Sequence, residues 1–106
     1  KIVDARSKNR FDGKEPEPRK GLRSGSIPNS LCLPFKHLIE NDKTFKSKEE
    51  LFKIFRSVLK HDFSSKVVFS CGSGVTASVL ALAYSLIDNK YNPVIYDGSW
   101  SEYGRI

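Results

Sequence analysis

The sequence predicts an α/β fold, with a mostly parallel sheet of four to five strands and helices on both faces of the sheet. Short β-branched runs alternate with helical patterns along the chain, and this alternation favours parallel strands joined by right-handed crossovers. A chain of 106 residues is long enough for one hydrophobic core. We therefore expect residues 1–106 to form a single domain whose ligand site lies at the carboxyl ends of the strands.

The first half of the chain holds two short predicted strands and a long polar segment between them. Lys1–Ala5 and the stretch 31–33 are the strands, and residues 6–26 are rich in Gly, Pro, Arg and Lys. We expect residues 6–26 to be a loop, and a loop of that length in a small domain is usually functional or disordered. A brief helical turn is expected over Phe35–Glu40, after a proline.

Two helices are predicted in the second half. Ser47 and Glu50 fit a capping box, and apolar residues at helical spacing follow as far as Leu59. The second helix, Thr76–Asp88, is apolar on nearly all sides, so we expect it to be largely buried. The remaining strands and turn are expected at Val67–Phe69, Val94–Tyr96 and Asp97–Trp100.

The composition narrows the classes of ligand. The net charge is +6, but the basic residues are scattered and form no aromatic-interleaved stripe of the kind that binds nucleic acid. We therefore predict a small anionic ligand and no direct nucleic-acid contact. No apolar run approaches the ~20 residues that a membrane span needs. The two cysteines, Cys32 and Cys71, make no CxxC motif, so neither zinc nor dithiol chemistry is indicated.

The chemistry is predicted at Cys71, where a buried strand meets a glycine loop and then a helix. Gly72 and Gly74 let the backbone take positive φ, so that loop N–H groups form an anion-binding cradle with Cys71 at its mouth. The start of the helix adds free N–H groups that favour a thiolate. Cys32 lies between two leucines without a glycine loop, and we expect it to be a core residue.

Two rival chemistries are disfavoured by single positions. Cysteine phosphatases also place a cysteine between a strand and a helix, but they need an arginine six residues later to clamp the phosphate. This chain has Ala77 at that position. A P-loop nucleotide-binding site is excluded because no Gly-Lys-Ser/Thr follows the loop.

Several stretches of the chain carry a family pattern. They are Val3–Arg6, Arg10-Phe11, Pro16–Arg19, Gly25–Pro28, Cys71–Thr76 and Tyr96–Trp100. Together they resemble the C-terminal, catalytic rhodanese domain of the 3-mercaptopyruvate sulfurtransferases, in the tandem-rhodanese family, and the resemblance covers nearly the whole chain. The loop Cys-Gly-Ser-Gly-Val-Thr resembles the mercaptopyruvate subfamily, whereas thiosulfate sulfurtransferases resemble Cys-Arg-Lys-Gly-Val-Thr.

The resemblance implies roles for the site residues. Cys71 attacks the sulfur of 3-mercaptopyruvate, pyruvate leaves and a persulfide remains on Cys71, with no cofactor and no metal. Arg10 and Arg19 hold the substrate carboxylate and keto group, which suits the two-point geometry of a guanidinium. Ser73 is implied as a second catalytic residue, which hydrogen-bonds substrate and relays protons. The other loop residues implied in substrate binding are Gly72, Gly74, Val75 and Thr76.

The chain also departs from the family pattern. Ser26 stands where the family usually has His, and Asn29 where it has Gly; we interpret both as turn changes with little effect on the chemistry. The chain begins on its first strand, so we expect it to be the catalytic domain of a two-domain protein whose N-terminal rhodanese domain contributes to the cleft. His37 and His61 match no catalytic position and are expected at the surface.

Three functions stay open at this point. The first is an enzyme that moves sulfane sulfur from 3-mercaptopyruvate or thiosulfate to cyanide or to a thiol such as thioredoxin. The alternative is a relay protein that accepts persulfide from a cysteine desulfurase for tRNA thiolation. A non-catalytic interaction module would instead have a Cys71 no more reactive than a free thiol. A reactive thiol suits a reducing compartment, so cytoplasm or mitochondrion is predicted.

Overall fold

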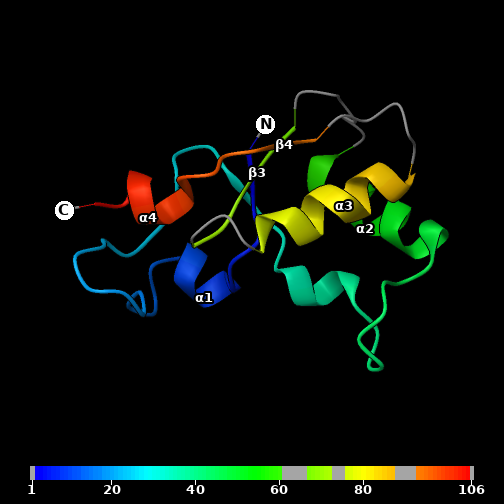
Figure 1. The fold of residues 1–106 in the computed structure, drawn as a ribbon, viewed down its shortest axis with the longest axis horizontal. Helices are drawn as coiled ribbons and strands as arrows, with labels where there is room; N and C mark the ends of the chain where they lie inside the picture. Colours follow the sequence, from blue (N-terminus) through cyan, green and yellow to red (C-terminus); the bar gives the residue numbers. More distant parts are fainter. Residues whose placement is uncertain (1, 61–66, 73–75, 88–92, 106) are drawn as a thin grey trace.

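A four-stranded parallel sheet forms the centre of the computed structural model, which describes residues 2–60, 67–72, 76–87 and 93–105 (Figure 1). The strands are β1 (Ile2–Asp4), β2 (Leu31–Cys32), β3 (Val68–Ser70) and β4 (Val94–Ile95). Their spatial order is β2-β1-β3-β4, and every neighbouring pair is parallel. The predicted α/β class with a parallel sheet is confirmed.

Helices cover the sheet. They are α1 (Lys8–Phe11), the 3-10 helix η1 (Phe35–Leu38), α2 (Lys48–Leu59), α3 (Ala77–Ile87) and α4 (Ser99–Tyr103). In Figure 1, α2 and α3 lie together on one side of the strands, and α4 lies on the other. This arrangement leaves the carboxyl ends of β1 and β3 side by side, because Asp4 pairs with Ser70.

Two short helices lie where a loop and a turn were expected. The predicted loop 6–26 contains α1, whose first turn is capped by the Ser7 hydroxyl accepting from the Arg10 N–H at 3.4 Å. The predicted turn at 97–100 leads directly into α4. Helices of four and five residues are too short to show helical periodicity in a sequence. Asn29 does lie in a turn, with a φ of 65°, a conformation that glycine and asparagine tolerate best.

Helix α2 begins as its sequence predicts. The Ser47 hydroxyl accepts a hydrogen bond from the Glu50 N–H at 3.2 Å and contacts the Glu50 carboxylate at 3.2 Å. The buried side of the helix packs into a cluster in which the rings of Phe55, Phe69 and Tyr84 have centroids 5.2–6.3 Å apart. This aromatic cluster joins α2, β3 and α3 and so fixes the strand that leads to Cys71.

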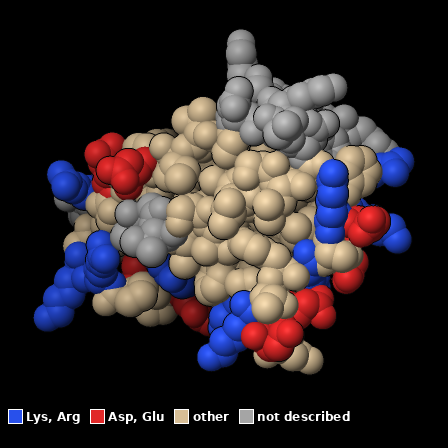
Figure 2. Space-filling model, turned by 45° about the vertical axis from the view of Figure 1, so that its right-hand side comes forward, with Lys and Arg blue, Asp and Glu red and all other residues tan. Residues whose placement is uncertain are grey.

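Helix α3 is less buried than its sequence indicated. Leu82 and Leu86 are 53% and 48% exposed, although the side that faces the core is buried. A single layer of helices on a sheet leaves the outer side of each helix toward solvent, so an apolar sequence alone does not bury every side. Figure 2 shows this side as a broad area without Lys, Arg, Asp or Glu. Among the described residues, no helix is both long and apolar enough to cross a membrane.

Candidate active site

Cys71 follows β3 at the carboxyl edge of the sheet, and the beginning of α4 fixes its backbone. The Cys71 N–H donates to the Ser99 hydroxyl at 3.0 Å, and the Cys71 carbonyl accepts from the Trp100 N–H at 2.9 Å. The next carbonyl, that of Gly72, accepts from the Ser101 N–H at 2.8 Å. These hydrogen bonds hold the residue after β3 and the first loop residue in one backbone conformation.

The structure corrects one expectation about this loop and shows how deeply Cys71 lies. Cys71 is only 1% exposed and packs in the hydrophobic core. Gly72 is outside the positive-φ region, so glycine is not needed there for its backbone angle. It is needed for space: an added Cβ would lie 2.9 Å from Nη2 of Arg10.

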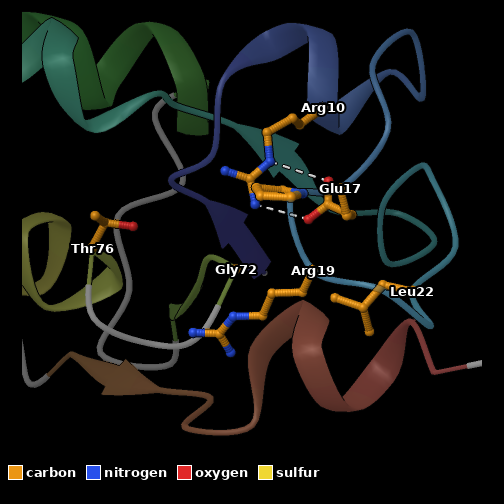
Figure 3. Close-up of a pocket in the computed structure, with 7 residues that line it drawn as sticks. Arg10, Glu17, Arg19, Leu22, Gly72 and Thr76 are labelled. Carbon is orange, nitrogen blue, oxygen red and sulfur yellow. Dashed lines mark hydrogen bonds and ion pairs between the residues drawn. The ribbon is translucent and has the colours of Figure 1, made fainter.

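A pocket of about 230 Å³ opens beside Gly72 (Figure 3). Its lining consists of Arg10, Glu17, Pro18, Arg19, Leu22, Gly72 and Thr76. Figure 3 shows the guanidinium groups of Arg10 and Arg19 on opposite sides of Gly72. Arg19 makes no hydrogen bond or ion pair with any other described residue, so its charge is available to a ligand. The fold thus brings both predicted arginines to Gly72, the residue that follows Cys71.

Behind the pocket lies a chain of alternating charges. Arg6 is buried and binds Asp4 through Nε and Nη2, at 2.8–3.2 Å, and its Nη1 reaches the Glu17 carboxylate at 3.2 Å. Glu17 in turn accepts from Arg10 at 2.8 Å and 3.1 Å. The Arg6 guanidinium carbon lies 4.9 Å from the ring centroid of Trp100, which is a cation–π distance. This network connects the end of β1 to the pocket and to α4.

The charges around Arg10 favour its protonated form. The pKa of Arg10 is raised, mainly by its hydrogen bond to Glu17, while burial opposes the shift. The negative charges of Glu17, Asp4 and a Cys71 thiolate add to the increase. A thiolate on Cys71 is therefore within electrostatic range of Arg10, although Cys71 is buried and does not line the pocket.

A family model described as "Rhodanese-like domain" matches residues 1–105. The chain is a rhodanese-like domain. It is 48% identical over 103 residues to "Thiosulfate/3-mercaptopyruvate sulfurtransferase 1, mitochondrial" of Arabidopsis thaliana, covering 95% of this chain and 26% of that protein. It is 44% identical over 102 residues to the 3-mercaptopyruvate sulfurtransferase of Mus musculus, covering 96% of this chain and 34% of that protein.

The fold of this rhodanese-like domain also matches solved structures. The sub-stoichiometric sulfur transferase subunit of yeast mitochondrial complex I superposes with a TM-score of 0.84 at 42% identity, covering 97% of this chain and 34% of that chain. The predicted family is therefore confirmed. The domain spans between about a quarter and a third of the length of the curated relatives that it matches.

The structure of this rhodanese-like domain brings some of the predicted site residues together. The pocket is lined by Arg10, Arg19, Gly72 and Thr76, and Cys71 is the residue before Gly72. The predictions for Ser73, Gly74 and Val75, and the loop N–H groups expected there, lie outside the described residues, as does His61. Ala77 is fully buried in the core.

The sequence did not single out Glu17, Arg6 or Ser99 as site residues. Glu17 has one local signal, since it stands between two prolines and near both predicted arginines. The contacts of Arg6 and Ser99 join distant segments, so spacing alone could not reveal them.

Cys32 was predicted to be a core residue, but it lies outside the core cluster. Its side chain is only half-buried and lines a groove between η1 and α2, beside the exposed His37. Its thiol lies 3.7 Å from the Arg6 carbonyl. Partial burial, followed by the charge of Asp4, raises the pKa of the Cys32 thiol to about 11. Cys32 therefore stays a neutral thiol at physiological pH, unlike a nucleophile.

Proposed function

We propose that this domain transfers sulfane sulfur through a persulfide on Cys71, as the catalytic part of a sulfurtransferase. The observation that carries the proposal is the placement of Gly72, the residue after Cys71, between two arginines in one pocket. One of these cations, Arg10, is held in place by Glu17 and lies within electrostatic range of a Cys71 thiolate. A thiol nucleophile next to an anion-binding pocket suits a small anionic sulfur donor.

The favoured donor is 3-mercaptopyruvate. Its carboxylate and keto oxygen can each accept from a guanidinium, and the pocket offers Arg10 and Arg19 for them. One relative named for both thiosulfate and 3-mercaptopyruvate, and another named for 3-mercaptopyruvate alone, support this substrate class. Thr76 lines the same pocket. We also propose Ser73 as a second catalytic residue and Gly74 and Val75 as substrate-binding residues.

The transfer takes two displacement steps. In the first, the Cys71 thiolate forms a bond to the sulfur of 3-mercaptopyruvate, and the bond between that sulfur and carbon breaks. The electron pair stays on carbon as the enolate of pyruvate, which takes a proton and leaves. In the second, an acceptor thiolate or cyanide bonds to the outer sulfur, and the Cys71 thiolate returns. No net oxidation occurs, so the reaction needs no redox cofactor.

Intact mass and pyruvate release test this proposal together. Protein incubated with 3-mercaptopyruvate should gain the mass of one sulfur atom and release pyruvate, and added cyanide should remove the sulfur as thiocyanate. Cys71→Ser should lose all three signals, whereas Cys32→Ser should keep them. Full activity in Cys71→Ser, or sulfur found on Cys32, would contradict a Cys71 persulfide.

The relay alternative uses the same persulfide with a different donor. A sulfur adduct formed with a cysteine desulfurase and cysteine, but not with 3-mercaptopyruvate, would favour it. We further propose that an N-terminal rhodanese domain closes the cleft, that thioredoxin or a similar thiol accepts the sulfur, and that the protein acts in the cytoplasm or mitochondrion. A relative whose name includes "mitochondrial" supports that placement.

A further inference from the structure

Glu17 is a buried carboxylate in the wall of the proposed donor pocket, and no role has been assigned to it so far. Its side chain is only 1% exposed. Oε1 accepts from Nη2 of Arg10 at 2.8 Å, and Oε2 accepts from Nε of Arg10 at 3.1 Å and from Nη1 of Arg6 at 3.2 Å. Two guanidinium groups therefore share one carboxylate.

These contacts decide which edge of Arg10 faces a ligand. The Nε and Nη2 edge is occupied by Glu17, whereas Nη1 makes no hydrogen bond with any other described residue. Rotation of the guanidinium would break two charge-assisted hydrogen bonds, so Arg10 is fixed with one free donor group. Gly72 leaves space for this orientation, because a Cβ there would meet Nη2.

Glu17 also sets the charge of the pocket. Its negative charge offsets that of Arg10, so the described part of the lining keeps one net positive charge, that of Arg19. Behind the lining, Asp4 offsets Arg6 in the same way. A pocket with one net positive charge matches a donor with one carboxylate better than a dianion.

We propose that Glu17 is a positioning residue that determines donor specificity. It fixes Arg10 for a carboxylate and limits the pocket charge, so that 3-mercaptopyruvate is preferred over the thiosulfate dianion. This inference rests on the proposed function for the identity of the donors. A purely structural ion pair would make a different prediction, because its loss would weaken the binding of both donors alike.

Donor affinities measured in a Cys71→Ser background test the inference without sulfur transfer. Glu17→Gln keeps the shape of the side chain and removes its charge. We expect its affinity for 3-mercaptopyruvate to fall about tenfold, equivalent to about 1.4 kcal/mol, while thiosulfate binds as well as before or more tightly. Calorimetric titration of each donor gives both constants. An equal loss for the two donors would overturn the specificity role.

Two further variants separate charge from position. Glu17→Asp keeps the charge on a side chain one methylene shorter. The affinity for 3-mercaptopyruvate should therefore fall, and the affinity for thiosulfate should not rise. Asp12→Asn is the matched control, since it removes an ion pair of 3.1 Å with Lys8 on the exposed side of α1. It should change neither affinity. Circular dichroism confirms that each variant is folded at the assay temperature.

A double-mutant cycle shows whether Glu17 acts through Arg10. In an Arg10→Met background, Glu17→Gln should cause no further loss of 3-mercaptopyruvate affinity. Full additivity would refute positioning of Arg10. The outcomes also separate the two proposals. If the wild-type protein makes no pyruvate but Glu17→Gln still shifts the donor preference, only the proposed function is contradicted. If the wild-type protein makes pyruvate but Glu17→Gln loses affinity for both donors equally, only the role of Glu17 is contradicted.

Discussion

The hydrogen bond from Cys71 to Ser99 predicts a specific cost for Ser99→Ala. The Ser99 side chain is fully buried, and its hydroxyl accepts from the Cys71 N–H at 3.0 Å and donates to the Tyr96 carbonyl at 2.7 Å. That carbonyl also accepts from the Ser99 N–H at 3.1 Å, so it keeps a partner in the variant. Ser99→Ala therefore removes the side-chain acceptor of one buried N–H, and such a loss costs about 1–3 kcal/mol.

Urea unfolding followed by circular dichroism measures this loss. For a domain of this size each kcal/mol corresponds to a fall in Tm of roughly 4–8 °C. Because Cys71 itself loses a backbone restraint, kcat for pyruvate release should also fall more than KM rises. Ser101→Ala is the matched control on α4: its hydroxyl donates to the Gly98 carbonyl at 2.8 Å, and that carbonyl also accepts from the Glu102 N–H. Equal stability of the two variants would refute the inference that Ser99 holds Cys71.

Three other predictions follow from local features. Ser47→Ala removes the cap of α2 and should cost about 1 kcal/mol in urea unfolding, with donor affinity unchanged; a change in affinity would contradict a purely local role. Gly72→Ala should displace Nη2 of Arg10 and strain its hydrogen bond to Glu17, so Tm should fall slightly and calorimetry should show weaker 3-mercaptopyruvate binding; unchanged binding would mean that the position of Arg10 is unimportant. In Cys71→Ser the remaining thiol, Cys32, has its pKa raised to about 11, so alkylation by iodoacetamide should be slow at neutral pH and keep rising up to about pH 11. A rate that levels off near the ordinary thiol pKa of about 8.5 would contradict the raised pKa.

The fold class and the family could be predicted from the sequence alone, and Cys71 stays the predicted nucleophile. Strand and helix periods, the Ser47 cap and the Cys-Gly-Ser-Gly-Val-Thr loop are local patterns, and local patterns report backbone conformation and the side of an element that faces the core. The same kind of information disfavoured phosphatase chemistry, because Ala77 occupies the position where a phosphate clamp is needed.

The surroundings of Cys71 became visible only in the folded chain. The depth of Cys71 and its hydrogen bond to Ser99, 28 residues away, depend on how the strands and α4 pack together. The ion pair from Arg6 to Glu17 depends on how the segment after β1 folds back on itself. The reason for Gly72 also changed, from backbone freedom to space for Arg10. Contacts between segments that are distant in the chain leave no period or spacing in a single sequence, so only the folded arrangement could show them.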